Sequence, residues 1–212
     1  MEPVTIEKNY VQDVYNIIAG PFDITRAYIW NKINTFIKNI PPDSLVADIG
    51  CGNGKNMLVD LNSTYLGCDF SITFANICNN KNLAVVCANN LHIPYRNNIF
   101  NFTMSVAVIH HFSTHERRLQ AVSELVRITA VGGLIYIQVW AMEQPDCSKR
   151  KFTTADNFVS WGSNKHQQIY NRFYHIFVDG ELQQLVSNLP NISITESFYE
   201  HGNWGVILTK LY

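Results

Sequence analysis

The chain has 212 residues and a mass of 24.2 kDa, enough for one domain with a full hydrophobic core and short for two. Hydrophobic residues make up 47% of the sequence and aromatic residues 12%, which excludes a disordered, collagenous or coiled-coil chain. The formal net charge is -1, so no overall basic field draws the chain onto nucleic acid or an anionic membrane. No apolar run approaches the ~20 residues of a membrane span, and the start lacks a secretion signal. We therefore expect one soluble domain, residues 1–212, in the cytoplasm or also in the nucleus.

Two helices are expected at the start of the chain. Apolar residues recur at helical spacing over residues 6–18 and again over residues 29–37, after Pro21. The proline pair that begins at Pro41 ends the second helix, because proline cannot continue it. The sequence thus predicts two helices within residues 1–40.

Short apolar strands then alternate with helices. This alternation predicts right-handed crossovers and a mainly parallel sheet with helices on both faces, an α/β fold. The last two strands are close in sequence and should pair as an antiparallel hairpin. Residues 143–177 are polar and aromatic-rich, and we expect an irregular insertion there. Strands are expected over residues 45–49, 65–68, 83–87, 100–108, 134–140, 192–199 and 204–211, and helices are expected to begin near Gly54, Ser71, Thr114 and Asp179.

Three alternating glycines follow the first expected strand, in the segment VADIGCGNGK. Gly50, Gly52 and Gly54 let the backbone turn sharply and approach a ligand without a Cβ in the way. The spacing differs from the G-x-G-x-x-G of dinucleotide sites, which argues against a nicotinamide oxidoreductase. It suits S-adenosylmethionine, which has no phosphate and favours nearby carboxylates. Asp48 precedes the turn, and Asp69 ends the next strand, where it can accept both ribose hydroxyls. The alternative is an ordinary strand-to-helix turn with Asp69 as a helix cap.

A doubly wound sheet with this loop resembles the class I S-adenosylmethionine-dependent methyltransferases, whose fold is Rossmann-like. In that family the third strand ends in an acid that accepts from the adenine amino group. Here Asn89 takes that place, and an amide oxygen can still accept. The resemblance implies S-adenosylmethionine as cofactor, and we expect no metal site because no cysteine pair is spaced as CxxC. Further cofactor contacts are implied for Cys51, Phe70, Asn90 and Val106.

A narrower resemblance rests on motifs spread along the chain. They include SVAVIHHFSTHERR at 105–118, GGLIY at 132–136, NRFYH at 171–175 and GNW at 202–204. These motifs resemble the eukaryotic tRNA methyltransferases that esterify 5-carboxymethyluridine at the wobble position, from about residue 7 to residue 210. The resemblance implies methyl transfer to that carboxylate, a tRNA substrate, a heterodimer with a small zinc-binding activator subunit, and N-terminal helices that cover the site.

The implied substrate decides the candidate catalytic residues. A carboxymethyl carboxylate is ionised at neutral pH, so it needs placement rather than a general base. Arg26 and Arg172 lie in family motifs outside the cofactor core, and a guanidinium fork holds a carboxylate well. His110, at a strand end, is expected near the transferred methyl group. The alternatives are surface ion pairs for the arginines and a structural role for the histidine.

Substrate contacts are implied for six further residues. The aromatic ones among them could stack on a flipped base, or they could belong to the core. The six are Tyr15, His111, Asn171, Tyr174, Asn203 and Trp204.

In the strand order that the resemblance to class I methyltransferases implies, the third strand lies at an edge of the sheet. Its residues, Leu83 to Cys87, include no charge or proline, and an apolar edge open to water is an aggregation hazard. We therefore expect Leu83, Val85 and Cys87 to bind the activator subunit by strand addition. Loops of the chain itself could cover the edge instead.

Two other functions remain open at this point. A class I methyltransferase that acts on a small molecule would also explain the modest charge and the lack of an obvious RNA-binding module. A chain that binds cofactor or partner without catalysis is less consistent with the intact glycines and Asp69.

Overall fold

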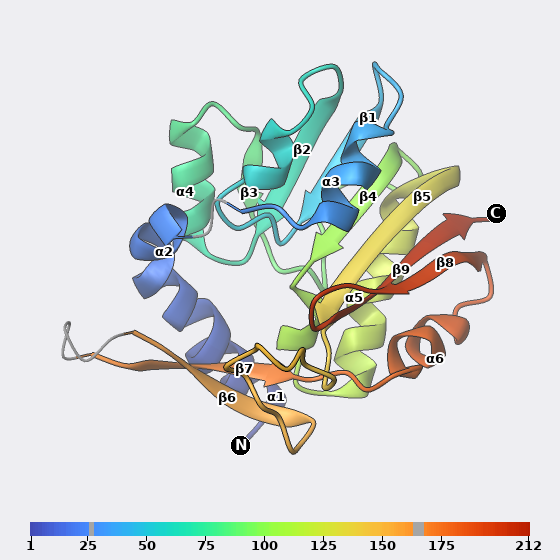
Figure 1. Cartoon of the computed structure of the whole chain (residues 1–212). Coiled ribbons are helices and arrows are strands. Elements are labelled where there is room, and N and C mark those ends of the chain that lie inside the picture. The colour runs from blue at the N-terminus through green and yellow to red at the C-terminus, as the bar shows by residue number, and fades with distance from the viewer. Residues whose placement is uncertain (26–27, 163–167) are drawn as a thin grey trace.

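A computed structural model of the chain describes residues 1–25, 28–162 and 168–212. Seven strands form one sheet in the order β3-β2-β1-β4-β5-β9-β8 (Figure 1). Strands β1 to β5 run parallel, while β9 pairs antiparallel with β5 and with β8. The predicted α/β fold, a mostly parallel sheet with a C-terminal antiparallel hairpin, is confirmed. The strands are β1 Leu45–Ile49, β2 Thr64–Asp69, β3 Val85–Cys87, β4 Phe100–Val106, β5 Thr129–Trp140, β8 Ile192–Tyr199 and β9 Asn203–Lys210.

Helices cover both faces of the sheet, because successive strand residues point to opposite sides. Ala47 and Ile137 belong to the buried cluster that α5 and α6 complete. Val46 and Tyr136, their neighbours in sequence, belong to the cluster that α3 and α4 complete. The helices are α1 Pro3–Glu7, η1 Lys8–Gln12, α2 Asp13–Thr25, α3 Asn31–Lys38, η2 Lys55–Leu58, α4 Ile72–Asn80, η3 Ile109–His111, α5 His115–Ile128 and α6 Glu181–Ser187.

The expected pair of N-terminal helices is present, but the first helix is longer than predicted. α1, η1 and α2 form one helical run from Pro3 to Thr25, with a π-helical stretch at η1, and α3 follows. Pro21 lies inside α2 instead of between two helices. Ile17, whose carbonyl would accept the N–H that Pro21 lacks, is 56% exposed, so water can replace that bond. Within the described ranges, the helices are all too short or too polar to cross a membrane.

The segment after the glycine turn is also shorter than expected. The structure has a single 3-10 turn, η2, where the sequence predicts a helix from Gly54. Asp60 Oδ1 accepts the backbone N–H of Asn62 at 3.0 Å, and this Asx turn returns the chain to β2. The predicted helix starts at Ser71 and Thr114 are confirmed, since both side chains cap the helices that follow them.

Three strand bounds differ from the prediction by two residues or more. β3 begins at Val85 rather than at residue 83, and β4 ends at Val106 rather than at residue 108. β5 begins at Thr129, earlier than predicted, because a bulge in the pairing with β4 carries it past Gly132. A glycine inside a strand often marks such a bulge, and here it hid the strand start in the sequence.

Residues 143–177, expected to be irregular, contain a second, two-stranded sheet. β6 (Asp156–Trp161) pairs antiparallel with β7 (Tyr170–His175). Phe158 and Phe173 face each other across the pair, and Tyr10 of η1 packs against Phe158 with ring centroids 4.7 Å apart. The predicted irregular insertion is therefore a hairpin, and its aromatic side chains pack it against the N-terminal helical run (Figure 1).

Candidate active site

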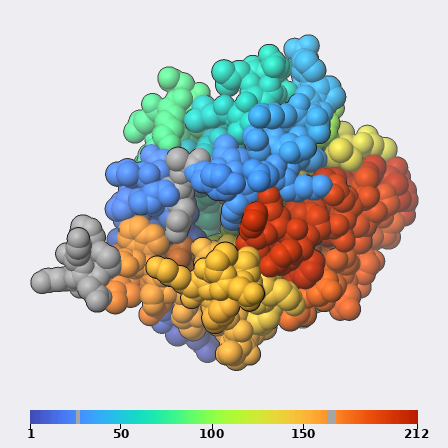
Figure 2. Space-filling model, viewed as in Figure 1, coloured from blue at the N-terminus to red at the C-terminus, as the bar shows by residue number. Residues whose placement is uncertain are grey.

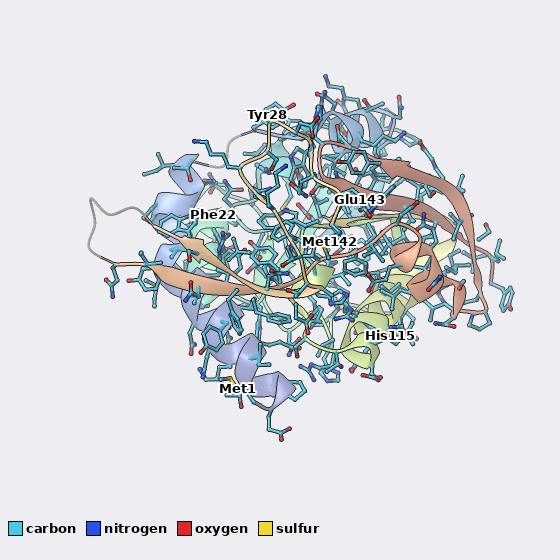
Figure 3. The ribbon with its side chains drawn as sticks, turned by 60° about the horizontal axis from the view of Figure 1, so that its bottom comes forward. Met1, Phe22, Tyr28, His115, Met142 and Glu143 are labelled. Carbon is cyan, nitrogen blue, oxygen red and sulfur yellow. The ribbon has the colours of Figure 1, made fainter. Side chains whose placement is uncertain are left out.

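A cavity of about 340 Å³ lies at the carboxyl ends of β1, β2 and β4. In an open α/β sheet these strand ends are where ligands bind. Its walls come from α2, the glycine turn, the segment after β5 and the β8–β9 turn, which meet on the face shown in Figure 2. Figure 3 turns this end forward, with Phe22 on the side of the N-terminal run and Met142 and Glu143 on the side of the segment after β5. Residues distant in sequence thus enclose one site.

The three glycines of the turn all have positive φ, but they do different things. A Cβ on Gly50 would lie 2.3 Å from the Val108 side chain, and one on Gly54 would lie 2.4 Å from the Leu83 side chain. A Cβ on Gly52 would meet nothing within 4 Å. Gly50 and Gly54 are therefore needed for packing, whereas Gly52 leaves space open in the cavity wall.

Asp69 connects the second strand to the glycine turn. Its Oδ2 accepts the backbone N–H of Gly52 and its Oδ1 accepts that of Ser71, both at 2.8 Å. Burial raises the pKa of Asp69 to about 6, and the two backbone donors oppose that shift. Ser71 is the residue that caps α4, so Asp69 is not simply a helix cap. It lines the cavity as a half-buried carboxylate with lone pairs that can accept from a ligand.

Asp48 lies behind the turn and does not line the cavity. The residue is 1% exposed, and neither carboxylate oxygen forms a well-aligned hydrogen bond in the described part of the chain, although the nearby Asn56 side chain opposes the effect of burial on its pKa. Burial raises its pKa to about 7. Neither Asp48 nor Gly54 is part of the cavity wall, so these two predicted cofactor residues support the turn from behind.

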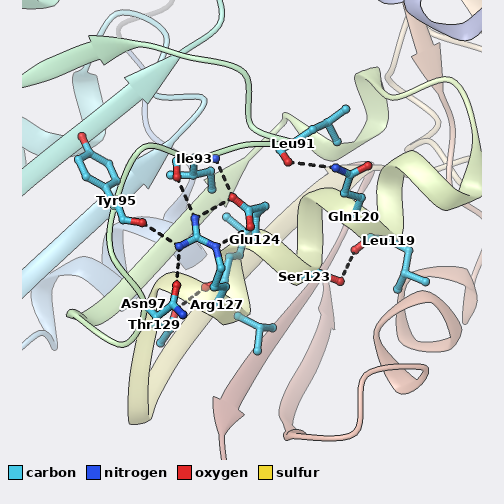
Figure 4. A network of polar contacts seen from close by, with 12 residues as sticks. Leu91, Ile93, Tyr95, Asn97, Leu119, Gln120, Ser123, Glu124, Arg127 and Thr129 are labelled. Atoms are coloured by element: carbon cyan, nitrogen blue, oxygen red, sulfur yellow. Dashed lines mark hydrogen bonds and ion pairs between the residues drawn. The ribbon is translucent and has the colours of Figure 1, made fainter.

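The other predicted cofactor residues do line the cavity: Cys51, Phe70, Asn89, Asn90 and Val106. The loop after Asn89 and Asn90 is held against α5. There Arg127 donates to the carbonyls of Ile93 and Tyr95, and Glu124 accepts the N–H of Ile93 at 2.7 Å (Figure 4). An ion pair between Arg127 and Glu124 completes this network. The sequence did not reveal this support, because it depends on Glu124 and Arg127, which lie more than thirty residues downstream of their partners.

The opposite side of the cavity carries a chain of hydrogen bonds whose donors can be assigned. His111 Nδ1 lies 2.7 Å from the carbonyl of Phe173, so it must carry a proton and donate. Burial lowers the pKa of His111 to about 3, so the ring is neutral and its Nε2 accepts. The Tyr15 hydroxyl, 3.0 Å from Nε2, is then the donor to it, and Tyr174 donates to Tyr15 at 3.2 Å. The network joins α2, η3 and β7.

Arg172 is a buried cation without an acidic partner in the described residues. The side chain is 4% exposed, and its Nε has no hydrogen-bond partner. Among the described residues, the Arg172 side chain forms one hydrogen bond, in which a terminal nitrogen donates to the Tyr15 hydroxyl at 3.5 Å. The guanidinium also lies 5.2 Å from the ring centroid of Tyr174. A buried charge of this kind is costly unless a ligand neutralises it, so the site is suited to an anion.

His110 is neutral and presents one nitrogen without a partner. Its Nδ1 accepts the backbone N–H of Trp140 at 3.1 Å, so the proton of the neutral ring is on Nε2. Nε2 has no partner among the described residues. Burial lowers the pKa of His110 well below its ordinary value, and the positive charge of Arg172 acts in the same direction. His110 can therefore donate a hydrogen bond but cannot serve as a cationic acid at neutral pH.

Several cavity residues were not predicted as site residues. Trp140 stacks on Tyr174 with ring centroids 4.1 Å apart and planes 8° apart, and the Arg150 guanidinium lies 4.0 Å from the Trp140 ring. Trp140 ends β5, so its place at a carboxyl strand end could have identified it. Arg150 follows in an irregular segment, where no periodicity places a side chain. The others include Gln12, Phe22, Tyr28 and Trp30 of the N-terminal region.

Two predicted substrate residues lie outside the cavity. Asn171 is exposed on β7 and bonds to Ser160, because it alternates with the inward-facing Arg172. The indole of Trp204 donates to Glu143 at 2.7 Å, away from the cavity. Neither residue therefore faces the cavity, whereas Tyr15, His110, His111, Arg172, Tyr174 and Asn203 all line it. Arg26 lies outside the described residues.

The comparisons with known proteins agree with this geometry. Residues 47–137 match the family model described as "Methyltransferase domain". A Schizosaccharomyces pombe tRNA (carboxymethyluridine(34)-5-O)-methyltransferase is 38% identical, across 98% of this chain and 99% of that protein. The chain belongs to this methyltransferase family. A Xenopus tropicalis member is 34% identical across 98% of this chain but only 42% of its own length, so the chain spans less than half of that relative.

Solved structures share the fold of this tRNA methyltransferase family member. A Burkholderia thailandensis 1,6-didemethyltoxoflavin-N1-methyltransferase, solved with S-adenosylhomocysteine, is 12% identical with a TM-score of 0.72, over 100% of this chain and 92% of that one. A Haloferax volcanii methyltransferase in complex with the Trm112 activator is 13% identical with a TM-score of 0.71, over 95% of this chain and 98% of that one. At such identities the likeness concerns the fold alone.

Proposed function

We propose that this chain transfers the methyl group of S-adenosylmethionine to the carboxylate of 5-carboxymethyluridine at the wobble position of tRNA. The observation that carries the proposal is Arg172, a buried guanidinium without an acidic partner in the described residues, in the same cavity as the glycine turn. The carboxylate of that nucleoside would neutralise it. The names of the relatives, which describe this reaction, support the same substrate.

The cavity residues fit the proposed cofactor. The space in front of Gly52 leaves room for a ligand against the backbone, and Asp69 offers carboxylate lone pairs in the same wall. Asn89 and Asn90 follow β3, beside that wall. When bound, S-adenosylmethionine supplies an electrophilic methyl group on a sulfonium. The side of the cavity that would hold it contains carboxylate and amide groups, which suit a cationic ligand.

The residues of the chain can perform the rest of the reaction by placement. The substrate carboxylate is ionised at neutral pH, so its oxygen attacks without losing a proton to a base. The neutral state of His110 and His111 agrees with this, since neither ring needs to take up a proton. Arg172 would hold one carboxylate oxygen and Tyr15 would keep Arg172 in position. Walls of Tyr174 and Trp140 exclude water from the reacting groups.

A direct experiment tests the proposed substrate. The purified chain would be incubated with S-adenosylmethionine and tRNA that carries 5-carboxymethyluridine, and the nucleosides would be analysed by mass spectrometry. We expect the methyl ester of 5-carboxymethyluridine to accumulate. Control tRNA that lacks the 5-carboxymethyl group should not be methylated. Transfer to small carboxylic acids but not to tRNA would support the alternative, a methyltransferase of small molecules.

We also propose that a small zinc-binding activator pairs with the open edge of β3. Gly67 donates to the carbonyl of Ala84, and Ala88 donates to the carbonyl of Asp69. Because alternate residues of a strand direct their backbone groups to opposite edges, those of Val85 and Cys87 face away from β2. The known fold relative solved with the Trm112 activator is consistent with such a partner.

The side chains at this edge correct part of the sequence-based expectation. Val85 is buried and Leu83 is half-buried against the core, so neither offers a side chain to a partner; Cys87 is exposed. The proposed contact therefore rests on the backbone. Cys87→Pro removes an outward N–H with little loss of core packing and should release a co-expressed activator in a pull-down. Ile194→Pro on β8, the other edge strand, is the matched control and should retain it.

A further inference from the structure

The β8–β9 turn presents one polar group to the cavity that the proposed reaction leaves unused. Asn203, the first residue of β9, is 3% exposed and lines the cavity. Its Nδ2 donates to the carbonyls of Glu200 and His201, at 3.0 and 3.2 Å. Because both partners are carbonyl oxygens, the amide atom that faces them must be the nitrogen. The second terminal atom of the Asn203 side chain is therefore the oxygen, Oδ1. That Oδ1 is buried and has no hydrogen-bond partner in the described part of the chain.

The turn that carries Asn203 is rigidly built. Glu200 and Asn203 exchange two backbone hydrogen bonds, at 2.9 and 3.0 Å. Gln144 donates to the carbonyl of Gly202 at 3.0 Å, and Glu200 accepts the N–H of Lys32 at 3.0 Å. A buried acceptor without a hydrogen bond lowers the stability of the fold, because it has lost its water and gained no donor. A donor on a bound ligand would supply the missing hydrogen bond.

The position of Asn203 favours the substrate over the cofactor. The glycine turn and Asp69 end β1 and β2, whereas β9 is separated from β1 by β4 and β5. Three interstrand spacings amount to roughly 14 Å. Asn203 instead pairs in register with Trp140, whose ring stacks on Tyr174 beside Arg172. Asn203 and Arg172 thus belong to the same side of the cavity.

We propose that Oδ1 of Asn203 accepts the N3–H of the uracil base and makes the site specific for uracil over cytosine. This inference rests on the proposed function. In uracil only C4 separates C5, which carries the carboxymethyl group, from N3, so one ring can reach both Arg172 and Asn203. Neutral cytosine has a lone pair at N3, which would face the lone pairs of Oδ1. Cytosine would leave the buried Oδ1 without a hydrogen bond, so the site should bind cytosine more weakly than uracil.

The test combines a changed substrate with a changed enzyme. Anticodon stem-loops would carry 5-carboxymethyluridine or its N3-methyl derivative, and kcat/KM would be measured for the chain with its zinc-binding activator. For the unaltered chain we expect the N3-methyl group to lower kcat/KM about tenfold or more. In Asn203→Ala, we expect a similar loss with the natural base and no further loss with the N3-methyl base, because the oxygen is gone and its space is open.

Asn157→Ala is the matched control. Its Nδ2 also donates to two carbonyls of a turn, those of Thr154 and Ala155, but it does not line the cavity. We expect this variant to keep normal kcat/KM and the full N3-methyl effect. Calorimetry should show unchanged S-adenosylmethionine affinity in both variants.

The outcomes separate this inference from the function on which it rests. Equal use of both stem-loops by the unaltered chain, or an N3-methyl effect that persists in Asn203→Ala, would overturn the role of Asn203 while leaving the reaction intact. A loss of S-adenosylmethionine affinity in Asn203→Ala would assign the oxygen to the cofactor instead. No methylation of the natural stem-loop would reject the proposed function, and this inference with it.

Discussion

The two sides of the cavity are built in different ways. The side at β1 and β2 comes from one continuous stretch, residues 50–90, and presents backbone groups, the carboxylate of Asp69 and side-chain amides. The opposite side joins Tyr15, His111, Arg172 and Asn203, from four distant segments, and presents a cation, neutral imidazoles and aromatic rings. The first side suits a positively charged ligand and the second suits an anion.

This difference has a physical cause. A tight turn needs particular residues at fixed spacing, so a short stretch of sequence is enough to predict the side of the cavity that contains the glycine turn. The other side depends on tertiary packing, because Arg172 and His111 meet only when β7 packs against η3 and α2. Substitutions on the two sides should therefore affect separate ligands, and each prediction below tests that separation.

The largest effect is expected for Gly52→Val. The branched side chain would fill space that the structure leaves open in the cavity wall, and Gly52 has a φ of +54°, where a β-branched residue is strained. We expect at least a hundredfold loss of S-adenosylmethionine affinity by calorimetry. Gly132→Val is the control: Gly132 also has positive φ and open space around its Cβ, but it lies outside the cavity. Equal affinity in both folded variants would disprove the role of Gly52.

A smaller but substantial effect is expected for Arg172→Ala. Loss of a charge-assisted contact to the substrate carboxylate should cost about 1.5 to 3 kcal/mol, or roughly 10- to 150-fold in kcat/KM. Cofactor affinity should stay the same, because Arg172 belongs to the other side. Arg172→Lys keeps the charge but not the planar fork and should recover part of the loss. Normal transfer by Arg172→Ala would place the carboxylate elsewhere.

The dependence on pH should differ between cofactor binding and folding. Burial raises the pKa of Asp69 to about 6, and a cationic ligand favours its ionised form, so affinity should fall up to about tenfold per pH unit below 6. Stability should show the opposite trend. The unfolded carboxyl ionises near 3.8 while the folded one keeps its proton until about 6, so the free energy of unfolding should decrease as pH rises across that window.

Calorimetry and urea unfolding between pH 4.5 and 7.5, at about half-unit steps, would measure the two trends. In Asp69→Asn the affinity should be lower and no longer vary with pH in this window. A flat affinity profile for the unaltered chain would show that Asp69 does not titrate where we expect.

The smallest effects are expected for Asn171→Ala and Trp204→Phe. Both residues lie in family motifs but outside the cavity, so kcat/KM should remain within about twofold. Trp204→Phe loses the hydrogen bond to Glu143 and should lower the free energy of unfolding by about 0.5 to 1.5 kcal/mol. A large loss of activity in either variant would mean that tRNA contacts extend beyond the cavity.

Local patterns in the sequence were enough to predict the fold class, the alternation of strands and helices along the chain, and the glycine turn. Those features depend on local rules: alternating residues form strands, capping residues such as Ser71 and Thr114 start helices, and three glycines permit positive φ. The family motifs also indicated Arg172 and His110, which line the cavity. They could not show which motif residues face the cavity, and Asn171 and Trp204 lie outside it.

Which polar groups lack a hydrogen-bond partner could be seen only in the folded chain. That His110 Nε2, Arg172 Nε and Asn203 Oδ1 are buried and unpaired depends on every element packed around them. The β6–β7 hairpin shows the same limit, because its pairing is non-local and its aromatic residues fit a core or an insertion equally well. Local sequence rules fix backbone conformation, whereas burial and hydrogen-bond satisfaction are properties of the assembled fold.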